Sequence, residues 1–245
     1  SYYRSISKTI YRNFLIAMII SILIILSKNF ILMLTDNFFS TSNETQELIK
    51  TYISVRVLSV PAEFTIYILV GFYLGIQKTN ISSLLIIVLS ALNIIFSSFF
   101  VLTLDLNVFG VALGTLLANY ITVVVFSLFT YKYLVQKFQI IPTLNRLIVP
   151  SKILKLLTIN FDIFLRTVFL TFSFLWFVYL GSRLGEDYLA VNTILMQFII
   201  LAAFFLDAYA YSTEGIIGYT IGKKNKKSFL YAVSNSIQLS FLTGM

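Results

Sequence analysis

Long apolar segments alternate with short polar segments along the whole chain. Six of the apolar segments are longer than the roughly 18 residues that mark a candidate membrane-spanning helix, and a seventh begins near residue 227. The six lie at residues 13–35, 51–76, 81–104, 108–131, 152–180 and 188–222. We therefore expect an all-α fold, a polytopic membrane helix bundle with six complete transmembrane helices and a truncated seventh.

The composition places the chain outside the soluble globular proteins. Of its 245 residues, 58% are hydrophobic and only 11% are charged, and the mean hydropathy is +0.91, far from the usual globular balance. The sequence contains no cysteine and no histidine, which excludes disulfides and the usual soft-metal sites. We expect no metal or other cofactor and, without these residues or a paired-carboxylate motif, no enzymatic activity.

The distribution of basic residues predicts the orientation of the chain. The net charge is +8, but the two sides differ strongly when alternate loops are assigned to the same side of the membrane. One side holds thirteen basic residues, namely Arg4, Lys8, Arg12, Lys78, Lys132, Lys137, Arg146, Lys152, Lys155, Lys223, Lys224, Lys226 and Lys227. The other holds two, Lys50 and Arg183. Because basic loops remain cytoplasmic, we expect a multi-pass protein of the inner (plasma) membrane and no nucleic-acid partner.

The longest basic loop predicts a domain boundary. Residues 132–151 contain two of the three prolines and several cations. We expect residues 1–131 to form four spans of an N-terminal lobe and residues 152–245 to form the first spans of a C-terminal lobe. The segment 132–151 would be the cytoplasmic linker between them.

Charged residues also occur inside the apolar segments of the first lobe. Arg56 and Glu63 are seven residues apart and share a face of one helix, and Lys28 lies at a similar depth on the preceding antiparallel helix. Because charges within a membrane usually pair, we expect these three to form a structural cluster. Pro61, between them, should bend the helix and free a carbonyl group.

Small residues recur four apart in three segments, a spacing that lets membrane helices approach closely. We assign structural roles to the pairs Gly71 and Gly75, Gly110 and Gly114, and Gly218 and Gly222.

The second lobe carries the charged residues for which the sequence suggests a function. Asp162 and Arg166 are four apart, the spacing of a helical ion pair, and the short turn at 181–187 folds the next helix back against them. Counting down both arms of this hairpin places Asp162 level with Asp207. One carboxylate would then lack its own cation and could take a proton or Na⁺.

Further polar residues lie along the same hairpin. Asn192 and Gln197 are nearer the outer end, and Glu214 is about two turns closer to the cytoplasm. We include all three among the candidate cation- or substrate-binding residues.

Short motifs follow one another in a fixed order along the chain. In the first lobe they are RVLSVPA at 56–62, GFYLGIQ at 71–77, LNII at 92–95 and VFGVALGT at 108–115. In the second lobe they are NFDIFLR at 160–166, GSRLG at 181–185, LAVN at 189–192, LDAYA at 206–210 and EGIIG at 214–218. Together these motifs resemble those of the MATE (multidrug and toxin extrusion) transporters, in particular their DinF-type branch.

The resemblance implies twelve spans in two six-helix lobes, of which this chain would supply helices three to eight and part of nine. Helices 1–2 and 10–12 would be its missing partners. It further implies secondary active efflux of small amphipathic or cationic substrates, coupled to H⁺ or Na⁺ by alternating access. Asn93 and Thr115 join the candidate binding residues on this basis. Ser97 stands where DinF-like relatives carry Asp, and Phe161 where relatives commonly have Arg.

Two alternatives remain open at this point. A lipid-linked oligosaccharide flippase of the same superfamily would need several cations in its cavity to hold pyrophosphate, and Arg166, Lys28 and Arg56 are few for that purpose. An inactive truncated remnant is the other alternative, suggested by the missing ends and by Ser97.

Overall fold

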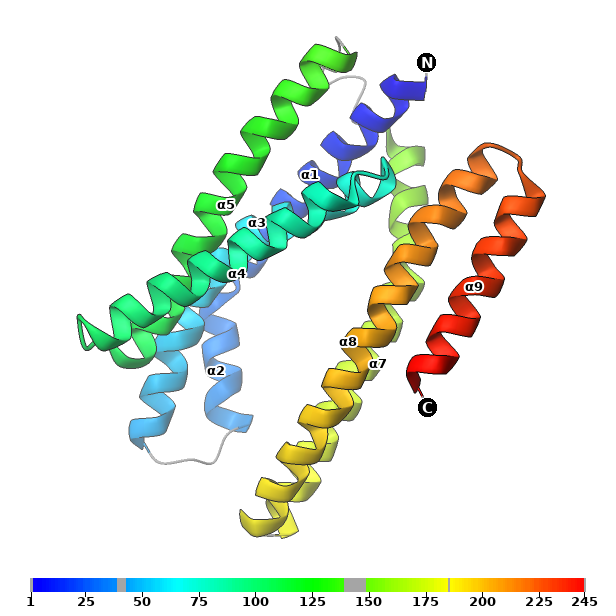
Figure 1. Ribbon diagram of the computed structural model, residues 1–245. Coiled ribbons are helices and arrows are strands. Elements are labelled where there is room, and N and C mark those ends of the chain that lie inside the picture. The colour runs from blue at the N-terminus through cyan, green and yellow to red at the C-terminus, as the bar shows by residue number, and fades with distance from the viewer. Residues whose placement is uncertain (1, 39–42, 139–148, 185, 245) are drawn as a thin grey trace. The chain divides into compact units, whose positions relative to one another are not determined.

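The computed structural model describes residues 2–38, 43–138, 149–184 and 186–244. The chain divides into two compact units, Ser1–Ile148 and Val149–Met245 (Figure 1). The division lies within the linker that the sequence predicts, although residues 139–148 of that linker are outside the described part. The six predicted spans are confirmed, because six of the described helices are long and apolar enough to cross a membrane.

The described residues of unit 1 form five helices. They are α1 (Tyr2–Leu26), α2 (Lys28–Phe38), α3 (Asn43–Gly75), α4 (Thr79–Leu102) and α5 (Asn107–Phe138). The first predicted span, 13–35, is wrong in one respect, because the helix breaks at Ser27 and continues as α2. The polar run of Ser27, Lys28 and Asn29 explains the break, since short polar side chains compete with the helical backbone for hydrogen bonds.

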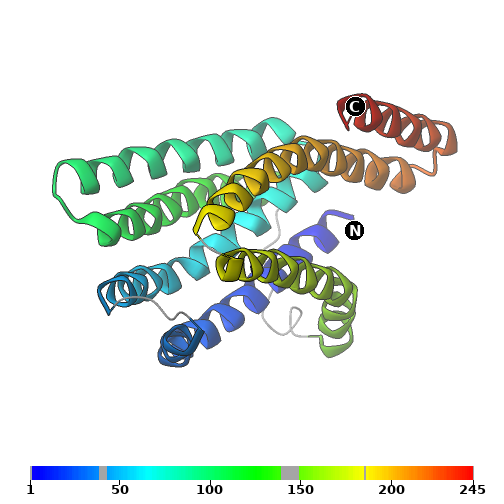
Figure 2. The same ribbon diagram turned by 90° about the horizontal axis from the view of Figure 1, so that it is seen from below.

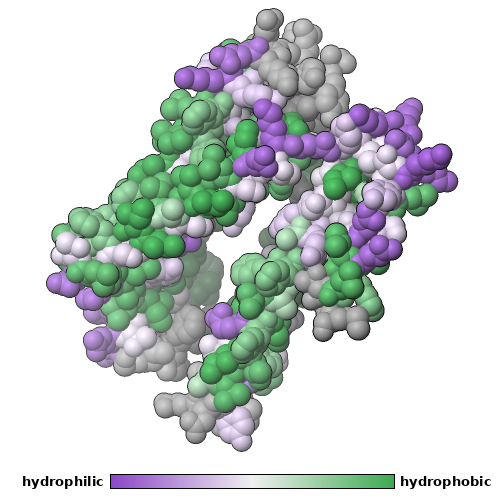
Figure 3. Space-filling view, viewed as in Figure 1, coloured by the Kyte–Doolittle hydropathy of each residue, from purple (hydrophilic) through white to green (hydrophobic). Residues whose placement is uncertain are grey.

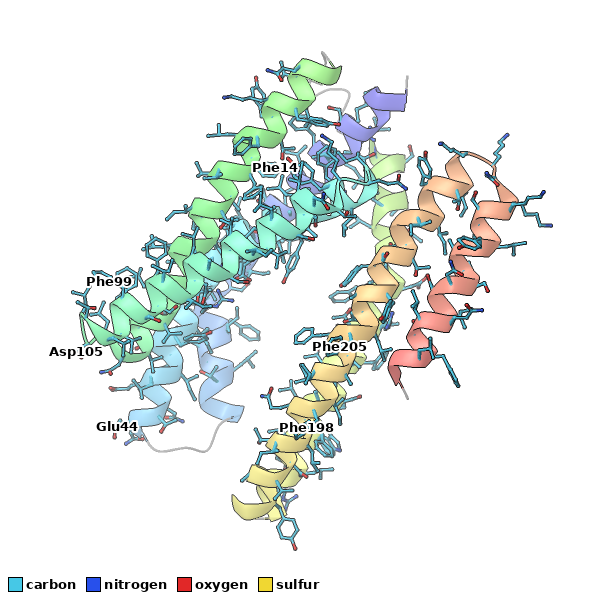
Figure 4. The ribbon with its side chains drawn as sticks, in the orientation of Figure 1. Phe14, Glu44, Phe99, Asp105, Phe198 and Phe205 are labelled. Carbon is cyan, nitrogen blue, oxygen red and sulfur yellow. The ribbon has the colours of Figure 1, made fainter. Side chains whose placement is uncertain are left out.

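Tight turns join the long helices of unit 1. Gln77 ends α3 with a φ of 60°, and the Lys78 backbone N–H donates to the Tyr73 carbonyl at 2.8 Å. This left-handed residue closes the helix end and reverses the chain into α4. At the opposite end of the unit, Asp105 lies in the α4–α5 turn with a φ of 52°. Glu44, at the start of α3, lies at the same end (Figure 4).

The core of unit 1 lies between α3, α4 and α5. Ile66, Leu69, Leu85 and Phe126 are buried together there. A second buried group includes Tyr73, whose hydroxyl is 2.8 Å from the Thr130 hydroxyl across the α3–α5 contact. Because a polar group inside an apolar bundle is costly unless it is paired, this hydrogen bond fixes the register of the two helices.

Helices α4 and α5 make the closest contact in unit 1. A Cβ atom at Gly114 would lie 2.6 Å from the Ser97 backbone nitrogen, and one at Gly110 would lie 3.0 Å from the Phe100 Cβ. Only glycine permits this approach at Gly114, since any side chain would overlap the facing backbone.

Unit 2 consists of α7 (Pro150–Leu184), α8 (Glu186–Gly222) and α9 (Lys226–Gly244). Figure 2 shows their long axes from a second direction. Lys224, with a φ of 54°, turns the chain between α8 and α9, and the Asn225 side chain caps α9 by accepting from the Ser228 N–H at 3.1 Å. Helix α9 is 19 residues long and is not among the six candidate spans of the described residues.

The outer surfaces of both units are apolar. Hydrophobic side chains cover the middle of the α4–α5 pair, and hydrophilic ones gather toward its ends (Figure 3). On α8, Phe198 and Phe205 project from the helix (Figure 4) and are 66% and 57% exposed. Such surfaces are suited to contact with lipid acyl chains.

Candidate functional site

An ion pair on α3 is the centre of the polar site in unit 1. The Arg56 Nη1 lies 2.6 Å from Glu63 Oε1. Ser59, between them on the same helix face, donates from its hydroxyl to Glu63 Oε1 at 2.7 Å and accepts from Arg56 Nη1 at 3.0 Å. The spacing of three and four residues places the three side chains one above another. The two charged side chains are 28% and 26% exposed, so the pair is partly shielded.

Helix α5 binds this network from the other side. The Asn119 side-chain amide donates to Glu63 Oε1 at 3.2 Å, and Asn119 itself is 4% exposed. One residue on, the Tyr120 hydroxyl donates to the Leu58 carbonyl at 2.9 Å. Pro61 has no N–H and leaves the carbonyl four residues before it without its helical hydrogen bond. The Leu58 carbonyl is next to that one. Side chains of α5 therefore bind both the ion pair and the backbone of α3 near Pro61, and the bend expected at Pro61 stays a prediction.

A cavity of about 430 Å³ lies beside the ion pair. Its polar lining comes from three helices and consists of Arg56, Glu63, Tyr67, Ser90, Asn93, Thr115 and Asn119. The rest of the lining is mostly aliphatic and includes Ile86, Leu89 and Ile94. The structure thus brings the predicted binding residues Asn93 and Thr115 to the same cavity as a carboxylate and a guanidinium. A mostly apolar pocket with a few converging polar groups is the usual form of a small-molecule site.

The sequence missed several residues of this site. We assigned Arg56 and Glu63 a structural role only, and Ser59, Ser90 and Asn119 received none. Asn119 carried a usable signal, because it lies four residues after Thr115 and therefore on the same helix face. The helical period identifies a face but does not identify the neighbour that it meets, so the cavity was not predictable.

Two other residues, Lys28 and Ser97, do not belong to this network. Lys28, expected in the cluster, makes no ion pair with Glu63 among the described contacts. Ser97, one turn from Asn93, packs its hydroxyl against Gly114. That hydroxyl is buried without a hydrogen-bond partner among the described residues. The cavity lining does not include Ser97.

In unit 2 the predicted charge cluster is not assembled. Asp162, Arg166 and Asp207 are all exposed, and no salt bridge joins them within the described part of the chain. Their role as a coupling site therefore stays a prediction.

Glu214 lies in a groove between α8 and α9. The groove also contains Thr213 and Ser236, whose hydroxyls are hydrogen-bonded to each other, and Gly218. The Asn192 amide lies against Gly181, where an added Cβ would be 2.7 Å from Nδ2. Gln197 is exposed on α8. The six predicted polar positions of α7 and α8 are thus distributed along the hairpin.

The remaining glycine pairs have open space around them. No described atom outside the helix lies within 4 Å of a Cβ built at Gly71, Gly75, Gly218 or Gly222. The close approach that we assigned to these four positions stays a prediction.

Several known proteins are similar to this chain in sequence. No family model matches the chain. The DNA damage-inducible protein F of Escherichia coli is 30% identical over 230 residues, which are 93% of this chain and 49% of the relative. The multidrug export protein MepA of Staphylococcus aureus is 26% identical over 206 residues, 82% of this chain and 45% of the relative. The chain thus spans about half the length of the curated relatives it matches.

Solved structures match the fold closely at low sequence identity. A MOP superfamily transporter from Pyrococcus furiosus superposes with a TM-score of 0.85 at 20% identity, covering 98% of this chain and 54% of that one. An outward-facing multidrug resistance MATE family transporter gives a TM-score of 0.83, also at 20% identity, covering 97% and 56%. The ordered motifs, the helical fold and these relatives together identify the chain as a homologue of the MATE family membrane transporters.

Proposed function

We propose that the protein is a secondary active exporter of small amphipathic or cationic molecules, driven by inward movement of H⁺ or Na⁺ through alternating access. The observation that supports this most is the 430 Å³ cavity of unit 1, where a carboxylate, a guanidinium and neutral hydrogen-bonding groups meet among membrane-spanning helices. Polar residues at such depth are costly and usually serve the transported species.

The membrane potential provides enough free energy to drive such a mechanism. One elementary charge moving inward through 100 mV releases about 2.3 kcal/mol. For an uncharged substrate exchanged for one ion, that free energy supports accumulation of roughly fiftyfold against a gradient. A single coupling carboxylate is therefore enough for useful export.

We assign the coupling role to the second lobe. Asp207 is the first candidate, with Asp162 and Arg166 on the facing arm of the hairpin and Glu214 further along α8. In this proposal the four spans of 1–131 and the helices of 152–245 belong to two lobes that move against each other, and the basic loops face the cytoplasm of the inner membrane.

The test is ion-driven dye transport by the full-length protein in proteoliposomes. With an imposed Na⁺ or pH gradient, the wild type should move ethidium against its concentration gradient. Asp207→Asn should bind the dye but lose gradient-driven movement, because the side chain no longer exchanges an ion. Asp105→Asn, an acid in an exposed turn of unit 1, is the matched control and should transport normally. Unchanged ion-driven transport by Asp207→Asn would remove the coupling assignment, and no transport by the wild type would remove the function.

The flippase alternative receives less support from the site. A pyrophosphate group requires several converging cations, whereas the unit 1 cavity contains one guanidinium, and Glu63 already neutralises it.

A further inference from the structure

The ion pair of unit 1 uses only part of the hydrogen-bonding capacity of its side chains. The recorded contacts of Glu63, from Arg56, Ser59 and Asn119, all end on Oε1. Arg56 uses Nη1 alone for both Glu63 and Ser59. Among the described residues, Oε2 of the carboxylate and Nε and Nη2 of the guanidinium therefore have no partner. Pairs of this kind are frequently bidentate, so the one-atom arrangement leaves both charges able to bind a second group.

These unused atoms belong to side chains that line the cavity. Each of the two side chains is about a quarter exposed, and the cavity is the concave surface that both of them share. Across it lie the neutral hydrogen-bonding groups of Asn93 and Thr115, and the aliphatic side chains of α4. A ligand here would meet an acceptor and a donor side by side at one end and an apolar wall elsewhere.

The net charge of the site selects the ligand. Arg56 and Glu63 together are neutral, so a ligand with one charge would leave an uncompensated charge within the membrane. Such a charge costs free energy, so a singly charged ligand should bind here more weakly than a zwitterion. A ligand that carries both charges at adjacent atoms keeps the site neutral, with its ammonium on Glu63 Oε2 and its carboxylate on the Arg56 donors. The planar guanidinium suits a carboxylate in particular.

We propose that this cavity binds a zwitterionic amphiphile whose ammonium and carboxylate are adjacent, as at the α-carbon of an amino acid, with an apolar body lying against Ile86, Leu89 and Ile94. The volume of about 430 Å³ matches a molecule of this size. The inference names a substrate class for the proposed export and rests on it for transport, whereas binding itself requires no ion gradient.

The test is equilibrium binding of three matched fluorescent probes to the full-length protein in nanodiscs at pH 6, where the amine of the ester is protonated, with empty nanodiscs subtracted. The probes are Nε-dansyl-L-lysine (zwitterion), its methyl ester (cation) and its Nα-acetyl derivative (anion). The wild type should bind the zwitterion about tenfold or more tightly than either singly charged probe, as one additional charge-assisted hydrogen bond provides.

Arg56 should determine the preference for the zwitterion over the ester, and Glu63 the preference for it over the acetyl derivative. In R56Q the zwitterion should bind no better than the ester, because the carboxylate has lost its partner. In E63Q it should bind no better than the acetyl derivative, because the ammonium has lost its partner. R56Q/E63Q, which keeps the site neutral and retains hydrogen-bonding amides, should bind all three alike. K28Q removes a charge from the same unit outside the pair and should keep the wild-type order.

The results that would contradict this inference differ from those that would contradict the proposed export. A wild type that binds the ester as tightly as the zwitterion, or a preference for the zwitterion that survives in R56Q/E63Q, would overturn the inference. If the same preparation exports ethidium but shows no zwitterion preference, only this inference fails. If it binds the zwitterion selectively but moves no dye under any gradient, the proposed export fails and the binding site stands.

Discussion

The two units of the chain differ in whether the charged residues of their long helices form ion pairs. In unit 1, Arg56 and Glu63 pair on α3, and Asn119 of α5 completes the network. In unit 2, Asp162 and Arg166 have the better helical spacing, four residues instead of seven, yet they are exposed and form no ion pair among the described residues. The difference is the number of neighbours, since α3 lies against both α4 and α5 whereas most of α7 has no side chain buried against it. Spacing along a helix permits an ion pair, and packing from other helices stabilises it.

Substitution of glycines should give the largest difference in stability loss between the two units. Gly114→Val forces a side chain into the Ser97 backbone and should destabilise the full-length protein by about 3 kcal/mol. Gly218→Val adds the same atoms where no described atom lies within 4 Å and should change little. Thermal unfolding in detergent measures both. Equal losses of melting temperature would mean that Gly218 has a close neighbour in the whole protein.

Removal of one arginine from each unit should give the next largest effect. Arg56→Leu leaves Glu63 without its cation and should cost about 2 kcal/mol, less than a fully buried pair because both side chains are partly exposed. Arg166→Leu removes an exposed cation from a membrane helix and should be neutral or stabilising. The same unfolding assay applies. A large loss in Arg166→Leu would show that the Asp162–Arg166 pair forms in the whole protein.

Single hydroxyl groups should give the smallest effect. Tyr73→Phe removes the buried hydrogen bond to Thr130 and leaves that hydroxyl with only the Phe126 carbonyl, which should cost about 1 kcal/mol. Thr213→Val removes the Thr213–Ser236 contact in the half-exposed α8–α9 groove and should cost about half as much. Hydrogen exchange of α5 and α9 would report each loss locally. A greater loss at Thr213 would contradict the ranking of the two units.

The sequence was sufficient for the helices but not for the site. Apolar length predicted all six spans, and only the polar run at Ser27 escaped it, because a hydropathy average does not register a one-residue break. Asn93 and Thr115 became candidates through the family resemblance, and their meeting with Glu63 depends on how three helices pack. Helical spacing also favoured Asp162 and Arg166 over Arg56 and Glu63. Which of the two pairs forms within a unit depends on which helix is enclosed by others, and helical spacing does not contain that information.

The most direct test of the account is a double-mutant cycle at Arg56 and Glu63, measured as ion-driven transport of the zwitterion Nε-dansyl-L-lysine by the full-length protein in proteoliposomes. If the pair acts as one unit of a working transport site, R56Q and E63Q should each reduce the rate at least about tenfold, and R56Q/E63Q should lose little more than either alone. Wild-type rates in all three variants, or losses that simply multiply in the double variant, would contradict the account.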